Sequence, residues 1–160
     1  MQEYIVRFIA DAEAFTQLVR GIPVEEWDYK PTNTSWSITE IVVHVVDCEI
    51  VFQQRIKAIL SEENPLVPAF DQNSWASQLQ YSNGNIDDQL ALFLLLRKVF
   101  APTLQRIREE DGERVGTHSA DVELHLKDIV KKMFTHLHGH IGQIERNRVA
   151  FALTKIILYK

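Results

Sequence analysis

The chain has 160 residues, 46% hydrophobic and 24% charged, enough to bury the core of one globular domain and giving no sign of a second. Its formal net charge of -5, from 17 basic and 22 acidic residues, argues against a phosphate-neutralising surface and so against nucleic acid as a partner. Its single cysteine excludes an intrachain disulfide and any cysteine-rich zinc motif.

The first segment has the pattern of an amphipathic helix. From about residue 2 to residue 18, apolar residues recur at helical spacing, and Gly21 and Pro23 stop the helix. Acidic residues and a glutamine interrupt what would have to be an unbroken apolar stretch in a signal peptide or a membrane span. We therefore expect a cytoplasmic protein that does not engage a membrane.

The second helix begins at a strong capping signal. Ser37 is the expected N-cap, and Glu40, three positions later, completes a capping box. The helix should end near residue 60. The stretch that follows is rich in proline, asparagine and serine and carries Phe70, Asp71 and Trp75. We expect a loop with a short helical turn there, long enough to be a candidate pocket lid.

Two further helices occupy the second half of the chain. The third begins near Ile86 and extends to about Ile107, and Pro102 should kink it rather than end it, because the apolar period continues beyond the proline. A polar connection, "EEDGERVGTHSAD", follows. The fourth helix is under way by about Leu126 and continues past Ala150, and the tail "TKIILYK" is left unassigned.

Strict two-residue alternation, the pattern of strands, is nearly absent from the chain. Helices that each carry one apolar stripe can bury those stripes only against one another. The predicted fold is therefore all-α, a single antiparallel four-helix bundle over residues 1–160. The cores of such bundles are also where side chains on facing helices build metal sites.

Three of the six histidines lie close together in "HLHGH", at positions 136, 138 and 140. At roughly 100° per residue, His140 falls about 40° from His136, on the apolar side of the helix, whereas His138 falls about 200° away among charged residues. His136 and His140 thus form an inward pair with the i, i+4 spacing that lets two imidazoles bind one metal ion. His138 is expected to be solvated.

His44 is the candidate for a third ligand. It lies beside the apolar band of the second helix, so its imidazole should also point into the bundle. Three neutral imidazoles leave a coordination position open for water or substrate, as in catalytic zinc or nickel sites. The competing interpretation is that inward histidines are core residues satisfied by hydrogen bonds. Cys48, about 40° from His44, is interpreted as a small buried hydrophobe rather than a ligand.

Other polar residues near the predicted interior are candidates for supporting or catalytic roles. Glu49 lies near the middle of the apolar band, where its charge needs a partner that Arg97 of the third helix can supply. A structural ion pair is the favoured interpretation and a catalytic role the alternative. The remaining candidates are Glu40, Asp47 and Gln143, to orient an imidazole or a ligand, and Trp75 and His118, to line a pocket.

Several segments resemble the DinB/YfiT-like family. "WSITEIVVHVVDCE" (36–49) is similar to the motif of its second helix, and "HLHGHIGQI" (136–144) is similar to the motif of its fourth. Between them, "FDQNSWA" (70–76), "LLLRKVF" (94–100) and "RVGTHS" (114–119) resemble the family's intervening landmarks. The order is the same, so the resemblance covers nearly the whole chain.

The resemblance implies an up-down-down-up four-helix bundle, a homodimer, and a divalent metal held by three histidines. Carried over residue by residue, it assigns the metal to His44, His136 and His140. Zinc or nickel is the expected ion, with manganese as a third candidate. Some members of the family are thiol-S-transferases or isomerases that use bacillithiol, mycothiol or a related small thiol, and others are hydrolases.

The leading hypothesis is a divalent-metal-dependent enzyme that acts on a small molecule, either by thiol-S-transfer with a low-molecular-weight thiol or by hydrolysis. The alternative is a non-catalytic dimeric bundle, a ligand-binding or stress-associated module in which the metal is structural or absent. A further rival is a histidine pH switch without metal, which predicts opening or unfolding between roughly pH 5 and 7 that does not respond to chelators.

Overall fold

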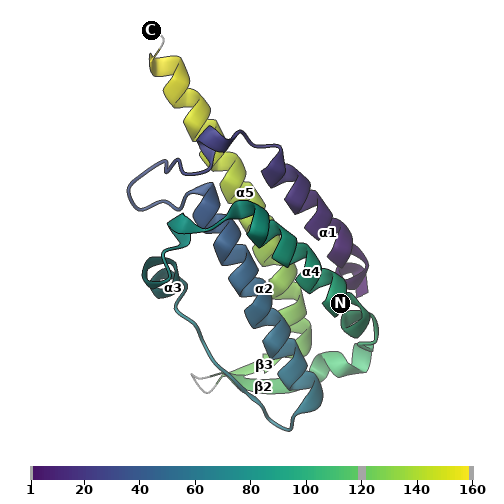
Figure 1. Cartoon of the computed structure of the whole chain (residues 1–160). Coiled ribbons are helices and arrows are strands. Elements are labelled where there is room, and N and C mark those ends of the chain that lie inside the picture. The colour runs from purple at the N-terminus through teal and green to yellow at the C-terminus, as the bar shows by residue number, and fades with distance from the viewer. Residues whose placement is uncertain (1, 119–121, 159–160) are drawn as a thin grey trace.

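Four long helices form most of the structure, a computed structural model that describes residues 2–118 and 122–158 (Figure 1). They are α1 (Gln2–Arg20), α2 (Ile38–Ser61), α4 (Ile86–Gln105) and α5 (Leu126–Leu158). In Figure 1, α1 runs up the bundle, α2 and α4 run down it, and α5 runs up again, so the long connection after α2 returns along the outside. The predicted all-α four-helix bundle is confirmed, with the up-down-down-up order that the resemblance implied.

Local sequence signals determine where the helices begin and how far they extend. The Ser37 side chain accepts a hydrogen bond from the Glu40 backbone N–H, and the Glu40 carboxylate accepts one of 2.8 Å from the Ser37 backbone N–H, which completes the capping box. Pro102 lies within α4 without ending it. At the C-terminus, α5 includes most of the segment "TKIILYK" and extends to Leu158.

A small three-stranded sheet, which the sequence did not predict, lies at the lower end of the bundle (Figure 1). Strand β2 (Val115–His118) pairs in parallel with β1 (Leu66–Val67) and antiparallel with β3 (Glu123–His125). A Cβ added at Gly116 would lie 2.6 Å from the Val67 Cγ2, so the missing side chain allows β2 to approach β1. Strand β2 belongs to the stretch expected to be a polar connection, and β3 lies between that stretch and the predicted start of the fourth helix. None of the three strands is long enough to show alternation.

Short helical segments fill the connections. The expected helical turn after α2 is α3 (Gln72–Gln78), whose N-terminal N–H groups are capped by the Asp71 carboxylate. The others are 3-10 turns: η1 (Val24–Glu26), η2 (Tyr81–Asn83) and η3 (Glu109–Glu113). In Figure 1, α3 lies outside the bundle beside α2, and it makes contacts with that helix.

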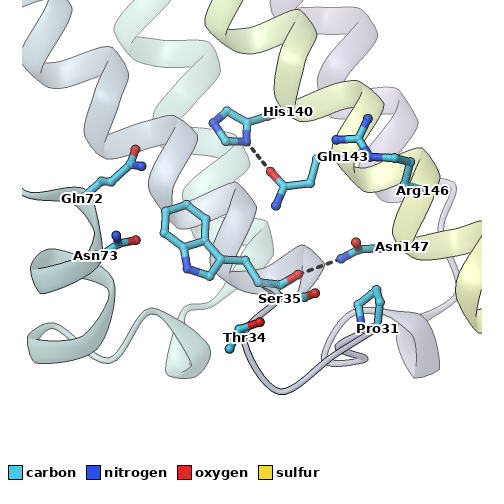
Figure 2. Close-up of a pocket in the computed structure, with 10 residues that line it drawn as sticks. Pro31, Thr34, Ser35, Gln72, Asn73, His140, Gln143, Arg146 and Asn147 are labelled. Atoms are coloured by element: carbon cyan, nitrogen blue, oxygen red, sulfur yellow. Dashed lines mark hydrogen bonds between the residues drawn. The ribbon is translucent and has the colours of Figure 1, made fainter.

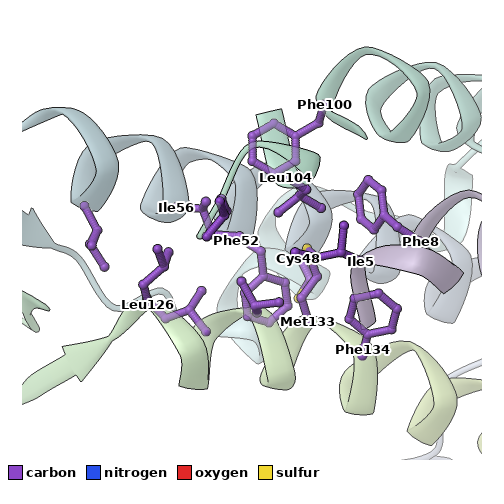
Figure 3. Packing of buried hydrophobic residues seen from close by; sticks show 14 of the residues in the cluster. Ile5, Phe8, Cys48, Phe52, Ile56, Phe100, Leu104, Leu126, Met133 and Phe134 are labelled. Atoms are coloured by element: carbon purple, nitrogen blue, oxygen red, sulfur yellow. The ribbon is translucent and has the colours of Figure 1, made fainter. Parts of the chain in front are cut away.

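Buried hydrophobic side chains form two main clusters, one toward each end of the bundle. The lower cluster is built around the rings of Phe8, Phe100 and Phe134 (Figure 3), and the upper one includes Phe15 and Phe93. Within the described ranges, no helix has the length and the hydropathy that a bilayer crossing requires. The part of α2 and α5 where the two clusters meet carries the candidate site.

Candidate metal centre

Three histidines from two helices meet between the hydrophobic clusters. His44 lies on α2, whereas His136 and His140 lie one turn apart on α5. The His136 Nε2 is 3.0 Å from the His44 Nε2 and 3.1 Å from the His140 Nε2. The ring centroids of His44 and His140 are 4.8 Å apart. The structure therefore brings together the three side chains that the sequence had singled out.

Aromatic rings surround this cluster of imidazoles. The ring centroids are 4.7 Å apart for Trp36 and His44, 5.6 Å apart for Phe52 and His136, and 6.5 Å apart for Phe70 and His44. His44 is fully buried. Such surroundings have a low dielectric constant and disfavour a charged imidazole. The contribution of Trp36 was missed from the sequence, because this residue precedes the N-cap of α2 and only the folded connection turns it toward the site.

The surroundings keep the histidines neutral. Burial lowers the pKa of His44 from 6.5 to about 4, and the nearby His140 adds to the effect. Burial lowers the pKa of His136 to about 3, helped by its two histidine neighbours, and it also lowers the pKa of His140. All three side chains are therefore uncharged at pH 7, the protonation state in which imidazole binds a metal ion.

Gln143 fixes the orientation of one of these rings. The His140 Nδ1 donates a hydrogen bond of 2.9 Å to the Gln143 Oε1 (Figure 2), so the lone pair of His140 is on Nε2, the atom that faces His136. Gln143 was a predicted supporting residue, and the contact is of the kind that orients a metal-binding histidine. Neutral, oriented and mutually adjacent imidazole nitrogens are a donor set that fits a divalent ion such as zinc or nickel.

Cys48 also lies at the cluster, on α2 one turn after His44. Its Sγ is 3.4 Å from the Nε2 of His44 and 3.7 Å from the Nδ1, so the sulfur sits beside the ring rather than directly beyond one nitrogen. The ligand atoms of His44, Cys48 and His136 all lie within 4.8 Å of one another, close enough for this trio to hold a metal as well. Burial raises the pKa of the thiol to about 12, which agrees with its interpretation as a buried, protonated side chain.

Two carboxylates that were candidates to orient an imidazole have other partners. The Glu40 carboxylate caps α2 and accepts a hydrogen bond of 2.7 Å from the Lys30 Nζ. The Asp47 Oδ2 accepts a short hydrogen bond from the Tyr81 hydroxyl. Burial raises the pKa of Tyr81, and this hydrogen bond raises it further. The expectation for Glu40 and Asp47 therefore needs correction, because both side chains are engaged in holding the connections against α2.

Glu49 and Arg97 form an ion pair in the core. The Arg97 Nε and Nη2 donate to the same Glu49 oxygen at 3.1 and 3.0 Å, and Nη1 donates to the Phe8 carbonyl at 3.0 Å. Gln53 donates to the second Glu49 oxygen. The two charged side chains are only 1% and 2% exposed. This geometry favours the structural interpretation of the pair over the catalytic one.

The remaining candidates lie around the site rather than in it. His118 lines a mostly apolar cavity of about 590 Å³ together with Phe52, whose ring contacts His136. Trp75 packs on Phe70 with ring centroids 4.8 Å apart, and Phe70 in turn lies near His44. His138 points away from the cluster, as predicted. It is not simply solvated, however, since its Nε2 lies 3.2 Å from the Asp11 Oδ2 on α1.

Comparison with solved structures agrees with this architecture. The chain superposes on the solved structure of YfiT from Bacillus subtilis with a TM-score of 0.86, over 94% of this chain and 87% of that one. That structure is described as "a probable metal-dependent hydrolase with an unusual four-helix bundle topology". Because the two sequences are only 19% identical, this likeness concerns the fold.

Relatives are also found by sequence. A protein of Oceanobacillus iheyensis named "Putative metal-dependent hydrolase" is 26% identical over 147 residues, which cover 89% of this chain and 84% of that protein. A protein of Bacillus licheniformis with the same description is 25% identical over 89% of this chain and 84% of its own length. Residues 7–144, which include all three histidines of the cluster, match the DinB superfamily. The chain belongs to the DinB superfamily.

Proposed function

We propose that this protein is a divalent-metal-dependent enzyme that hydrolyses a small molecule, with His44, His136 and His140 as the metal ligands. The observation that carries the proposal is the contact of three neutral imidazoles through their Nε2 atoms, at 3.0 and 3.1 Å, among aromatic rings. The sequence relatives carry the name "Putative metal-dependent hydrolase", and this name supports the hydrolytic reaction.

The chain's own residues prepare the site for such an ion. Gln143 holds His140 in the tautomer that presents Nε2, while Trp36 and Phe52 shield the imidazoles from bulk water. A divalent ion bound there would supply a positive charge able to polarise a carbonyl group or acidify water. His140 also lines a polar cavity of about 480 Å³, so a small molecule bound in that cavity would contact the cluster.

Thiol transfer remains the second candidate for the reaction. The charge of a divalent ion stabilises a thiolate by the same physical effect that acidifies water, and the polar cavity has room for a small thiol. The two reactions differ in what they consume. Hydrolysis consumes an ester, amide or lactone together with water, whereas transfer consumes a thiol together with an electrophile.

The first experiment is elemental analysis of the purified, untagged protein and of five variants. We expect about one divalent ion per chain in the wild type and in His138→Ala, and a nearly complete loss in His44→Ala, His136→Ala and His140→Ala. Cys48→Ala tests the rival ligand trio. If Cys48→Ala loses the metal and His140→Ala keeps it, the proposed ligand set is wrong; if even zinc- or nickel-treated wild type binds nothing, the metalloenzyme proposal fails.

A metal-loaded preparation then separates the two reactions. We expect turnover of activated esters, amides or lactones without added thiol, and loss of that turnover in His136→Ala but not in His138→Ala. Turnover that appears only when both a small thiol and an electrophile are supplied would replace hydrolysis by transfer. Circular dichroism of each variant distinguishes a lost ligand from a lost fold.

A further inference from the structure

We propose that the polar cavity beside His140 binds the carboxylate group of the substrate, and that Arg146 is the residue that recognises it. The inference rests on the proposed function, because it treats the histidine cluster as the reacting centre, and it names the chemical class of substrate for that site. The cavity lies between α5, α3 and the connection before α2 (Figure 2).

The charges around the cavity are the first argument. The protein as a whole is acidic, with a formal charge of -5, yet neither aspartate nor glutamate is among the residues that line this cavity, and Arg146 is the permanently charged one among them. A concave site with charge of one sign attracts ligands of the opposite sign. The cavity is therefore suited to an anion, even though the net charge of the whole protein is negative.

Arg146 is free to serve a ligand, unlike its neighbour on the same helix. The Arg148 Nε donates to the Glu26 Oε2 at 3.2 Å, and Arg97 is committed to Glu49. Within residues 2–118 and 122–158, no carboxylate forms an ion pair with Arg146. An arginine left without a counter-charge at the rim of a polar cavity is poised for one supplied by a ligand.

The Arg146 side chain is also directed along α5 toward the histidines. Its Nη1 is 3.5 Å from where a Cβ would stand at Gly142, so the side chain folds back by one turn, and Figure 2 shows it extending toward Gln143. Arg146 is at the rim, since it also borders a shallow groove lined by Glu145, Val149 and Leu153. A ligand that fills the cavity would contact both the Arg146 side chain and His140.

Neutral donors complete the cavity. The Gln143 oxygen is occupied by the His140 N–H, so its amide N–H groups are the part available to a ligand. Gln72 and Asn73 contribute further amide groups from α3. The Asn147 Nδ2 donates a hydrogen bond of 2.8 Å to the Trp36 carbonyl. This bond holds the connection before α2 against α5 and gives the cavity a fixed wall.

This set of groups favours a carboxylate over a phosphate. A guanidinium matches the two oxygens of a carboxylate with two parallel hydrogen bonds. A phosphate monoester carries close to two charges, and here it would find one permanent cation and otherwise neutral amides. Arg146 is six residues from His140, about 9 Å along the helix at most, so the carboxylate belongs several ångströms from the reacting group.

Matched hydroxamates provide the test, because a hydroxamate binds a metal ion through two oxygens. The probes are succinic monohydroxamic acid, its neutral monoamide, and the analogue with a phosphonate in place of the carboxylate, each titrated calorimetrically into the metal-loaded protein. We expect the wild type to bind the acid roughly tenfold more tightly than the amide. That preference should vanish in Arg146→Met, persist in part in Arg146→Lys, and be unchanged in Arg148→Met, the matched control.

Each other result overturns the inference. Equal affinities of acid and amide in the wild type, or a preference that survives in Arg146→Met, would show that Arg146 does not recognise the ligand. A larger preference for the phosphonate than for the acid would replace the carboxylate by a phosphate.

A metal-independent measurement separates this inference from the proposed function. In metal-free protein, N-acetylglycine should shift the backbone NMR resonances of residues 143–147 more than N-acetylglycinamide does, and Arg146→Met should remove the difference. If no hydroxamate binds but this difference is present, the proposed function fails and the carboxylate site stands. If the difference is absent while the neutral hydroxamate binds the metal, the carboxylate site fails alone.

Discussion

Replacing Arg97 by methionine tests whether the buried ion pair is structural or catalytic. The substitution removes two hydrogen bonds to Glu49 and one to the Phe8 carbonyl. It also removes the contacts of the guanidinium with the Phe8 and Phe93 rings, whose centroids lie 4.5 and 4.6 Å from the Arg97 Cζ. It leaves the Glu49 carboxylate buried with Gln53 as its donor. Breaking a buried pair in this way costs about 3 to 5 kcal/mol.

In a protein of this size, such a loss corresponds to a fall of about 10 °C in the unfolding midpoint. We expect urea and thermal unfolding of Arg97→Met to show this loss, while the metal content of the folded protein stays at the wild-type level. The double variant Glu49→Leu/Arg97→Met should recover part of the stability, because it leaves no unpaired charge. An Arg97→Met protein of wild-type stability that has lost activity would refute the structural interpretation.

Two further predictions concern the histidine cluster. Gln143→Leu should lower metal affinity by roughly 10- to 100-fold, because His140 loses the acceptor that orients it. Competition with a chromophoric chelator measures the affinity. The control is Gln72→Leu, which changes the same cavity but not the acceptor of His140, and its metal affinity should match that of the wild type. In the metal-free protein, the pKa values of about 4 for His44 and about 3 for His136 lie below the 6.5 of a histidine in the unfolded chain. The unfolded state therefore takes up protons first on acidification, and the melting temperature should decrease as the pH is lowered from about 6.5 toward 4. If the melting temperature of the wild type falls with pH no more steeply than that of His136→Gln, this prediction is wrong. A metal ion added at pH 6 should raise the melting temperature, whereas a histidine pH switch without metal predicts no such increase.

Those parts of the fold that depend on local sequence were predicted well. The capping box at Ser37 and Glu40 set the start of α2, and the apolar period beyond Pro102 showed that α4 continues through the proline. The grouping of His136 with His140 followed from helix geometry alone, because two residues one turn apart on the same face must project in similar directions. His138, two residues from His136, had to project elsewhere for the same reason.

Contacts between elements could not be predicted in this way. The parallel pairing of β1 with β2 joins segments about 50 residues apart in sequence, and strands of two to four residues carry no periodic signal. Angular position on α2 placed Asp47 near the His44 face, but it gave no information about Tyr81, which approaches from a connection and engages the carboxylate. Similarly, Trp36 reaches His44 and His140 only because the connection before α2 folds against α5.

The site therefore has two parts with different structural origins. The imidazoles lie on α2 and α5, and the packing of these two helices against each other fixes their positions. Much of the cavity wall comes instead from α3 and from the connection before α2, which the hydrogen bond from Asn147 to the Trp36 carbonyl ties to α5. Exposed connections tolerate sequence change more readily than helix cores. It follows that substitutions at Gln72 or Asn73 should alter which small molecule binds without altering metal content, so that selectivity and metal binding are separable properties of this bundle.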